Sequence, residues 1–254
     1  MSEARIKLPP AYSLIPFDEI DSTNAEARRR ADAGAPEGTL IVARRQTAGR
    51  GRRGRAWQSP AGNLYMSLLL RPDEPLENAA NLSFVAAVAL GEALAGLVPP
   101  MVEIGLKWPN DVLIHGHKCA GLLLESAAST PGKLDWLVIG IGVNISSHPE
   151  DLPYPATDLV FEGAVDATFE AVVEAFARHF LRWSDRWMDQ GFRPVRAAWL
   201  AMAHGLGEAI EVRLEEEIIH GRFEGLDDDG TLLVALDDGG IRRVVAGDVF
   251  PVSR

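Results

Sequence analysis

Residues 44–55 read RRQTAGRGRRGR and form the most distinctive stretch of the chain. They include six arginines and no acidic residue, although the 254-residue chain carries a formal net charge of −11. Three glycines, Gly49, Gly51 and Gly54, let the backbone come close to a ligand with its N–H groups free. Arginine adds a planar fork of donors suited to phosphate or carboxylate. This composition is typical of a loop that binds a polyphosphate.

The position of this loop limits what kind of site it can form. It lies between two predicted strands and does not open a helix, so it is neither a Walker-type phosphate loop nor a dinucleotide-binding turn. Composition alone leaves two other interpretations open, a solvated disordered loop and an arginine-rich segment that binds RNA. Acidic runs at 215–217 and 227–229 speak against a nucleic-acid-binding module.

The hydrophobic pattern on either side of the loop predicts an α+β fold. Strands are expected within 12–20 and at 39–43, 63–70, 111–114, 119–125 and 137–145; helices are expected after residue 23 and over 78–98, 169–187 and 195–202. Thr23 and Glu26 fit a capping box at the start of the first helix. Beyond Gly205, short β-prone pieces alternate with Asp-Gly turns, which indicates a small β-barrel. We therefore expect a domain over 1–204 and a second one over 205–254.

The bulk composition restricts the class of protein. A hydrophobic fraction of 47% and a charged fraction of 24% are globular values. The negative net charge argues against a surface built to coat nucleic acid. The single cysteine rules out an intramolecular disulfide, and the sequence contains neither a signal peptide nor an apolar run long enough to span a bilayer. We expect a cytoplasmic protein that does not enter a membrane.

A second polar cluster is the sequence KWPND at 107–111. Proline fixes its own φ and pushes the residue before it into an extended conformation. Lys107, Asn110 and Asp111 are thereby held at the mouth of a strand, where together they could bind a phosphate and its metal ion. The alternative interpretation is an ordinary β-turn with surface charges.

Two further features lie in apolar strands. Lys118 leads directly into the run CAGLLL at 119–124, where a charged amine is costly unless it is paired. It could equally extend its ammonium into solvent. Gly140 and Gly142 interrupt the apolar stretch 138–145, which suggests that a ligand or another backbone approaches closely there.

Together these stretches resemble the biotin–protein ligase family. The residues that carry the resemblance are 21–24 (DSTN), Gln46 with 49–54 (GRGRRG), 107–111 (KWPND), 118–121 (KCAG) and 140–144 (GIGVN). Their order and spacing agree over roughly residues 15–150. The resemblance implies a class II synthetase-like catalytic domain, with a mixed β-sheet flanked by helices, and an SH3-like C-terminal barrel. Residues 1–12 are too few for the winged helix of ligases that double as repressors, so no DNA binding is expected.

The resemblance also implies an activity. Such an enzyme joins biotin and ATP, with Mg²⁺, into biotinyl-5′-AMP and then transfers biotin to a lysine of a biotin carboxyl carrier protein. A lipoate–protein ligase of the same superfamily is the nearest alternative. Residues 44–55, which we call the arginine loop, and Gln46 favour biotin. An exposed sheet edge could pair two copies into a homodimer.

The site residues below are those that the resemblance implies. Biotin would be bound by Ser22, Thr23, Asn24, Gln46, Arg50, Gly51, Arg52, Lys118, Gly121 and Gly140. ATP would be bound by Arg50, Arg52, Arg53, Trp57, Lys107, Asn110 and Asn144. The catalytic residues would be Arg50, Lys107, Lys118 and Asp111, of which Asp111 would orient or deprotonate the acceptor lysine.

Cys119 departs from the family pattern, in which an aliphatic residue often follows the second lysine. An acyltransferase branch of the superfamily uses a cysteine as its nucleophile, which raises the same hypothesis here. A lone cysteine in an apolar strand is more often a small core residue with an unreactive thiol. We interpret Cys119 as a core residue.

Overall fold

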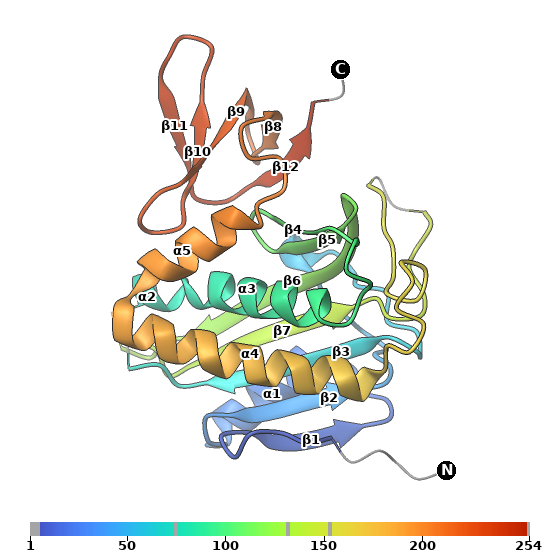
Figure 1. Ribbon diagram of the computed structural model, residues 1–254. Coiled ribbons are helices and arrows are strands. Elements are labelled where there is room, and N and C mark those ends of the chain that lie inside the picture. Colours follow the sequence, from blue (N-terminus) through green and yellow to red (C-terminus); the bar gives the residue numbers. More distant parts are fainter. Residues whose placement is uncertain (1–5, 74–75, 131–132, 152–153, 253–254) are drawn as a thin grey trace.

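The computed structural model describes residues 6–73, 76–130, 133–151 and 154–252. A mixed sheet of seven strands forms the larger part, and its helices lie on both faces (Figure 1). Across this sheet the strands are β1 (Ser13–Phe17), β2 (Thr39–Ala43), β3 (Leu64–Leu70), β7 (Trp136–Val143), β6 (His117–Ala127), β5 (Asp111–Ile114) and β4 (Ile104–Lys107). β1 and β2 pair in parallel, and the other described neighbours are antiparallel. The expected α+β class is confirmed.

Side chains that alternate along the central strands divide the core into two layers. The helices are α1 (Thr23–Asp32), α2 (Leu76–Ala79), α3 (Leu82–Ala95), α4 (Phe169–Gln190) and α5 (Phe192–Ala201). Ile41, Leu69 and Val138 pack against Ala27 and Ala31 of α1. Their neighbours along the strands belong to the larger core, together with residues of α3 and α4. These two helices lie on the other face of the sheet (Figure 1). Because both faces are covered, β2, β3 and β7 are apolar almost throughout.

The first helix begins differently from the prediction. Ser22, not Thr23, is the N-cap, and its Oγ accepts the backbone N–H of Ala25 at 3.4 Å. The carboxylate of Glu26 forms ion pairs with Arg29 and Arg30. The capping box prediction was therefore wrong by one residue, and the Thr23 hydroxyl is left for other partners.

Other elements differ from the sequence pattern at their ends. The predicted helix over 78–98 is observed as α2 followed by α3, and α5 begins earlier than expected. Strands β4 and β12 (Asp248–Pro251) were not predicted. Both are four residues long, too short for a clear alternation of polar and apolar positions. No helix in the described part of the chain is long and apolar enough to cross a membrane.

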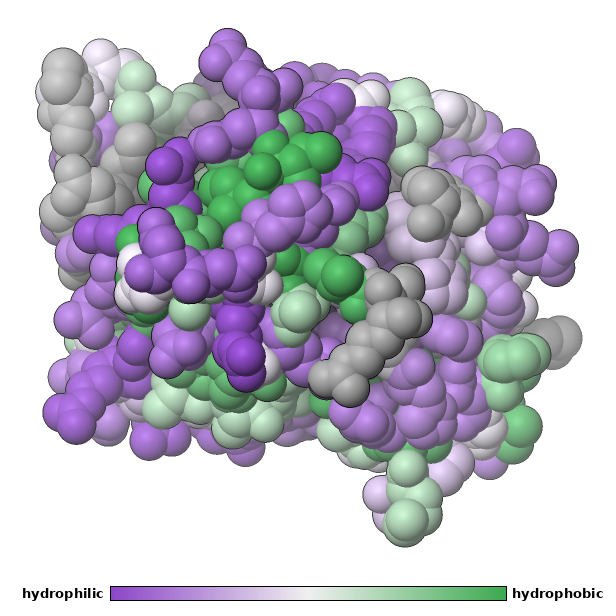
Figure 2. All heavy atoms as spheres, turned by 90° about the horizontal axis from the view of Figure 1, so that it is seen from above, coloured by the Kyte–Doolittle hydropathy of each residue, from purple (hydrophilic) through white to green (hydrophobic). Residues whose placement is uncertain are grey.

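The C-terminal part is a five-stranded antiparallel sheet. Its strands are β11 (Ile241–Val244), β10 (Leu232–Ala235), β9 (Ile218–Leu226), β8 (Ala209–Arg213) and β12, in that spatial order. The expected small all-β unit is thus confirmed, while β11 and β12 form its two edges, so the described pairing does not close into a barrel. Seen from above the view of Figure 1, the molecule presents a mostly hydrophilic face with smaller hydrophobic patches (Figure 2).

Aromatic contacts join the C-terminal sheet to the helices and loops of the larger part. The ring of Trp199, on α5, lies 5.8 Å from that of Phe84 and 6.3 Å from that of Phe223 on β9. The indole N–H of Trp108 donates to the carbonyl of Gly230 at 3.3 Å. These buried contacts fix the C-terminal sheet beside the 107–111 segment, and they bring β12 close to the arginine loop.

Candidate active site

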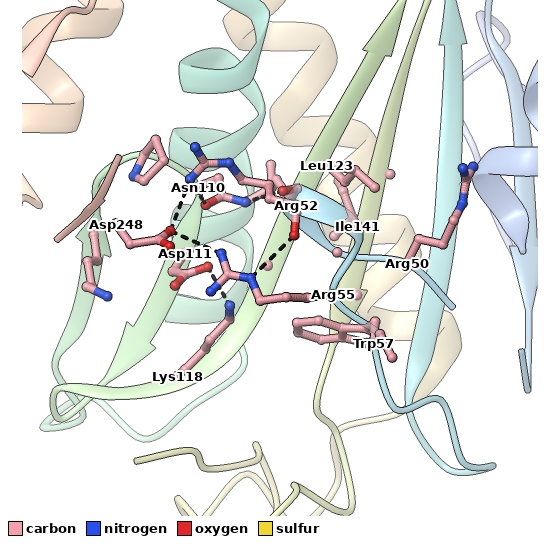
Figure 3. Close-up of a pocket in the computed structure, with 18 of the residues that line it drawn as sticks. Arg50, Arg52, Arg55, Trp57, Asn110, Asp111, Lys118, Leu123, Ile141 and Asp248 are labelled. Atoms are coloured by element: carbon pink, nitrogen blue, oxygen red, sulfur yellow. Dashed lines mark hydrogen bonds and ion pairs between the residues drawn. The ribbon is translucent and has the colours of Figure 1, made fainter. Parts of the chain in front are cut away.

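A cavity of about 300 Å³ lies between the large sheet, the arginine loop and β12. Sites for small molecules typically range over roughly 300–1,000 Å³. The predicted site residues in its lining are Ser22, Thr23, Asn24, Gln46, Arg50, Gly51, Arg52, Trp57, Lys107, Asn110, Asp111, Lys118, Gly121 and Gly140. Segments far apart in the sequence thus meet at one cavity, and Figure 3 shows many of these side chains directed into it.

Two predicted ATP-binding residues do not line this cavity. Asn144 is buried, and its Nδ2 donates to the carbonyl of Thr157 at 3.0 Å. Arg53 has a φ of 54° in the short turn 52–54, and its Nη1 lies 3.6 Å from Asp248. In this structure Asn144 thus holds a neighbouring segment and Arg53 lies beside Asp248, and the contact of either residue with ATP stays a prediction.

One end of the cavity is built from uncharged hydrogen-bonding groups. Gln46 accepts the backbone N–H of Thr23 at 2.8 Å and its hydroxyl at 3.2 Å. The Gln46 amide nitrogen donates to Ser59 at 3.0 Å. Ser67 is fully buried, and its Oγ lies 2.6 Å from Asn24 Oδ1 and 2.8 Å from Thr23 Oγ1. We call Ser22, Thr23, Asn24, Gln46, Ser59 and Ser67 the neutral end.

The glycines of β6 and β7 make room for side chains of the protein itself. A Cβ at Gly140 would lie 2.0 Å from Asn24 Oδ1, and one at Gly142 would lie 2.6 Å from the Trp57 indole. At Gly121 the corresponding distance to Trp57 is 3.0 Å. At Gly140 and Gly142 the close approach is thus made by protein side chains; both glycines also line the cavity, and the approach of a ligand to them stays a prediction. The buried Trp57 Nε1 has no hydrogen-bond partner among the described residues.

The opposite end of the cavity is charged. Asp248 of β12 lies 3.0 Å from Arg55 and 3.8 Å from Arg52 (Figure 3). Arg52 also donates to Asn110 Oδ1 and to the carbonyl of Gly247, both at 3.4 Å. Burial lowers the pKa of the Arg52 guanidinium, and the charge of Asp248 opposes that shift. We call Arg52, Arg55, Lys107, Lys118, Asp111 and Asp248 the charged end.

The two lysines of the charged end have different surroundings. Lys118 Nζ lies 2.7 Å from Asp111 Oδ1 and is flanked by the rings of Trp57 and Tyr154, at 5.3 and 5.2 Å from their centroids. Lys107 Nζ lies 5.4 Å from the centre of the Phe250 ring. Burial lowers the pKa of Lys107, while Asp111 acts in the opposite direction. The paired lysine and the desolvated lysine face the same cavity.

Arg50 is separated from the charged end. Its guanidinium pairs with Glu125 at 3.1 Å, and Figure 3 shows it directed away from the group around Arg52 and Asp248. The sequence grouped Arg50 with Lys107 and Lys118 as catalytic residues. The structure places Arg50 in the cavity lining but does not bring its charge to those lysines.

Several lining or supporting residues were missed by sequence reasoning. They are Arg55, Ser67, Tyr154, Asp248 and Phe250. Ser67 carried a usable signal, because a short hydroxyl side chain inside the apolar strand LYMSLLL must find a buried partner. Asp248 and Phe250 carried none, since their strand was not predicted and their neighbours in the cavity lie some 140–200 positions earlier in the chain.

The hypothesis of a cysteine nucleophile finds no geometric support. Cys119 is fully buried, and its Sγ donates to the carbonyl of Asn144 at 3.4 Å. Burial raises the pKa of the thiol well above its ordinary value, so the reactive thiolate is disfavoured. The residue is not part of the cavity lining.

Comparisons with known proteins agree with this arrangement. Residues 8–201 match the Biotin/lipoate A/B protein ligase family, and residues 205–250 match the Biotin protein ligase C terminal domain. The biotin–[acetyl-CoA-carboxylase] ligase of Paracoccus denitrificans is 44% identical over 236 residues, which cover 91% of this chain and 97% of that protein. The bifunctional ligase/repressor BirA of Bacillus subtilis is 36% identical, over 93% of this chain and 73% of that protein.

Solved structures show the same likeness. A biotin protein ligase from Aquifex aeolicus, in complex with biotin and ATP, has a TM-score of 0.80 and 32% sequence identity, covering 93% of this chain and 97% of that one. The matches in sequence and in structure thus extend over both parts of the molecule. The chain therefore belongs to the biotin/lipoate protein ligase family and carries the C-terminal domain of the biotin protein ligases.

Proposed function

We propose that this chain is an ATP-dependent biotin–protein ligase. It forms biotinyl-5′-AMP from biotin and ATP, and it transfers biotin to a lysine of a biotin carboxyl carrier protein. The observation that carries the proposal is one cavity with an uncharged hydrogen-bonding end and a cationic end. The names of the relatives support it, as does the likeness to an Aquifex aeolicus ligase in complex with biotin and ATP.

The neutral end fits the uncharged ureido head of biotin. The Thr23 hydroxyl lies 3.2 Å from Gln46 Oε1 and 2.8 Å from Ser67 Oγ, and a remaining lone pair of its oxygen would accept an N–H group of a ligand. Ser22 and Gln46 would complete the contacts with the ring, and the apolar side chains of Leu122 and Ile141 line the cavity beside them. A site that hydrogen-bonds a polar head discriminates strongly against analogues that lack it.

The charged end fits the chemistry of the first step. The biotin carboxylate is ionised at neutral pH and needs no general base, so the barrier comes from bringing two anions together. Arg52, Lys107 and Lys118 would hold the carboxylate and the α-phosphate in line and stabilise the charge as pyrophosphate leaves. The carboxylate oxygen attacks phosphorus, and the bond to the pyrophosphate oxygen breaks.

The second step needs a neutral acceptor amine. A lysine with an ordinary pKa near 10.4 must lose a proton before it attacks the mixed anhydride. Asp111 would orient this amine or accept its proton. Its present partner is the Lys118 ammonium at 2.7 Å, so the incoming amine would compete for the same carboxylate.

Mg²⁺ would enter with ATP. Within the described residues no group of three His, Cys, Asp or Glu side chains could hold a metal ion. Asp111 and Asp248 line the cavity, and one or two carboxylates together with phosphate oxygens are a usual environment for Mg²⁺. When bound, the ion would supply further positive charge beside the triphosphate.

Several finer assignments belong to the same proposal. We divide the chain into a catalytic domain over 1–204 and a C-terminal domain over 205–254, and we expect a cytoplasmic enzyme that binds neither DNA nor membranes. A homodimer would use an edge of the large sheet, where β1 and β4 are the edge strands. Backbone bonds from Leu106 to Met202 and from His204 to Leu106 already occupy part of β4, which favours β1.

The decisive assay is pyrophosphate release with biotin, ATP and Mg²⁺, with and without a biotin-acceptor domain. We expect release that depends on biotin, and transfer of label to the acceptor lysine. Unlabelled lipoate should not compete at equal concentration. Release that responds to lipoate and not to biotin would favour the lipoate ligase instead, and RNA binding with a steep salt dependence would favour a nucleic-acid-binding module.

A further inference from the structure

Glu125, on β6, connects the two parts of the site although it does not line the cavity. Its carboxylate lies 3.1 Å from Arg50 of the arginine loop and 3.2 Å from Arg28 of α1. It also accepts the side-chain amide of Asn24 at 2.8 Å. One carboxylate therefore holds three side chains, and two of these, Arg50 and Asn24, line the cavity.

The first consequence concerns the arginine loop. Inside the loop, the Gly51 N–H donates to the Arg55 carbonyl at 2.7 Å, and the Trp57 N–H donates to the Gly49 carbonyl at 3.0 Å. Asp248 binds the later arginines of the loop from the C-terminal sheet. Glu125 binds Arg50 from the large sheet. The loop is thus tied over the cavity by one carboxylate on each side.

The second consequence concerns Asn24. A carboxylate can only accept hydrogen bonds, so Asn24 must present its NH₂ group to Glu125 and its oxygen to Ser67. The second amide hydrogen is directed at the carbonyl of Leu123, 3.4 Å away. Gly140 leaves the space that this side chain fills. Glu125 therefore orients the Asn24 amide so that its oxygen faces the Ser67 hydroxyl, which lies 2.8 Å from Thr23 Oγ1.

From these contacts we propose that Glu125 is a positioning residue for the neutral end of the site, where biotin would bind. It anchors the arginine loop through Arg50 before any ligand is bound, and it aligns Asn24 behind Thr23. The identity of the ligand in this inference rests on the proposed function. The anchoring of the loop does not depend on that identity and can be measured in the unliganded protein.

The test uses Glu125→Gln, which removes the charge but keeps an oxygen acceptor for Asn24. Hydrogen exchange of the amides of residues 47–57 is measured without ligand. Because both partners are partly exposed, at 38% and 21%, the pair is of modest strength, and we expect exchange to be about twofold to fivefold faster in the variant. For biotin, Kd and KM should rise by a similar factor, while kcat at saturating biotin stays near that of the unmodified protein.

Two control variants separate this role from general destabilisation. Arg28→Gln removes the other arginine partner of Glu125 and should leave exchange in the loop unchanged. Glu26→Gln removes a carboxylate of α1 that pairs with Arg29 and Arg30, and it should behave likewise. Unchanged exchange in Glu125→Gln, or equal loosening in Arg28→Gln, would overturn the proposal. Absence of biotin-dependent pyrophosphate release from the unmodified protein would instead contradict the proposed function and leave the exchange result intact.

Discussion

The two ends of the cavity are held together by different kinds of interaction. The neutral end comes entirely from the large sheet and its first helix and loop, and its polar atoms already have partners at 2.6–3.4 Å. The charged end is assembled across two sheets, where Asp248 shares one carboxylate among three arginines at 3.0–3.8 Å.

This difference indicates how each end meets its ligand. Neutral groups with fixed partners are preorganised, so they can select a ligand by the direction of its donors and acceptors. Partly exposed ion pairs are weak and are readily exchanged for a better anion. We infer that an incoming carboxylate or phosphate competes with Asp248 for Arg52, while the vitamin head enters a site that is already formed.

The largest effect is expected at the charged end. Arg52→Ala removes an arginine that contacts both Asn110 and Asp248, and adenylate formation should slow by about 10²–10³-fold, as for the loss of one preorganised charged contact. Biotin-dependent pyrophosphate release measures the rate. Arg45→Ala, a control at an arginine that pairs with Glu19 outside the cavity, should remain active. Normal release from Arg52→Ala would show that the charged end has been assigned wrongly.

The second-largest effect is expected at the neutral end. Gln46→Leu leaves Thr23 and Ser59 without their partner, and an unsatisfied buried group of this kind costs about 1–3 kcal/mol. Biotin should therefore bind about tenfold to a hundredfold more weakly, while the affinity for ATP is unchanged. Titration calorimetry with each ligand separates the two. Gln190→Leu, at the exposed end of α4, is the matched control, and equal losses for both ligands would remove the distinction between the ends.

A third prediction concerns the packing behind the neutral end. A methyl group at Gly140 would lie 2.0 Å from Asn24 Oδ1, so the side chain must move. We expect Gly140→Ala to lower the free energy of unfolding by about 1–3 kcal/mol, as overpacking does, and to weaken biotin binding. Chemical denaturation measures the first effect. Gly96→Ala meets only ordinary contacts and should be neutral or stabilising; a neutral Gly140→Ala would contradict the packing.

The pH dependence of ATP binding tests Lys107. Burial lowers the pKa of this lysine, so its ammonium loses its proton as the pH rises through a value below that of an ordinary lysine. As the pH rises, ATP affinity should therefore decline at a lower pH than it would for a lysine with the ordinary pKa near 10.4. Lys107→Arg keeps the charge and should move that decline to higher pH. An identical pH profile in the two proteins would exclude Lys107 as the titrating group.

The smallest effect is expected at Cys119. The thiol is fully buried and outside the cavity, and its raised pKa disfavours the thiolate. Cys119→Ala should keep the adenylation and transfer rates, with a modest loss of stability from the smaller side chain. Complete loss of transfer with retained adenylation would revive the hypothesis of a cysteine nucleophile.

Local patterns predicted much of this molecule. Apolar runs such as 39–43 and 63–70 indicated the central strands, because a strand buried on both faces must be apolar throughout. The arginine loop and the KWPND segment stood out by their composition. Short edge elements such as β12 had no comparable signal, so Asp248 was missed.

It was harder to predict which residues pair with one another than to predict which residues line the site. Sequence spacing indicated that Arg50 and Arg52 belong to the same loop, but it could not indicate that one pairs with Glu125 and the other approaches Asp248. The same holds for Gly140 and Gly142, whose missing side chains make space for Asn24 and Trp57. Such choices depend on contacts between segments that are distant in the sequence.

The most direct test of the division into two ends is a crystal structure with biotin and a nonhydrolysable ATP analogue. We expect the ureido ring within hydrogen-bonding distance of Thr23 and Gln46, and the carboxylate and α-phosphate between Arg52, Lys107 and Lys118, with Arg52 released from Asp248. A biotin whose ring lies at the charged end, or an arginine loop that contacts neither ligand, would contradict the division of the cavity into a neutral and a charged end.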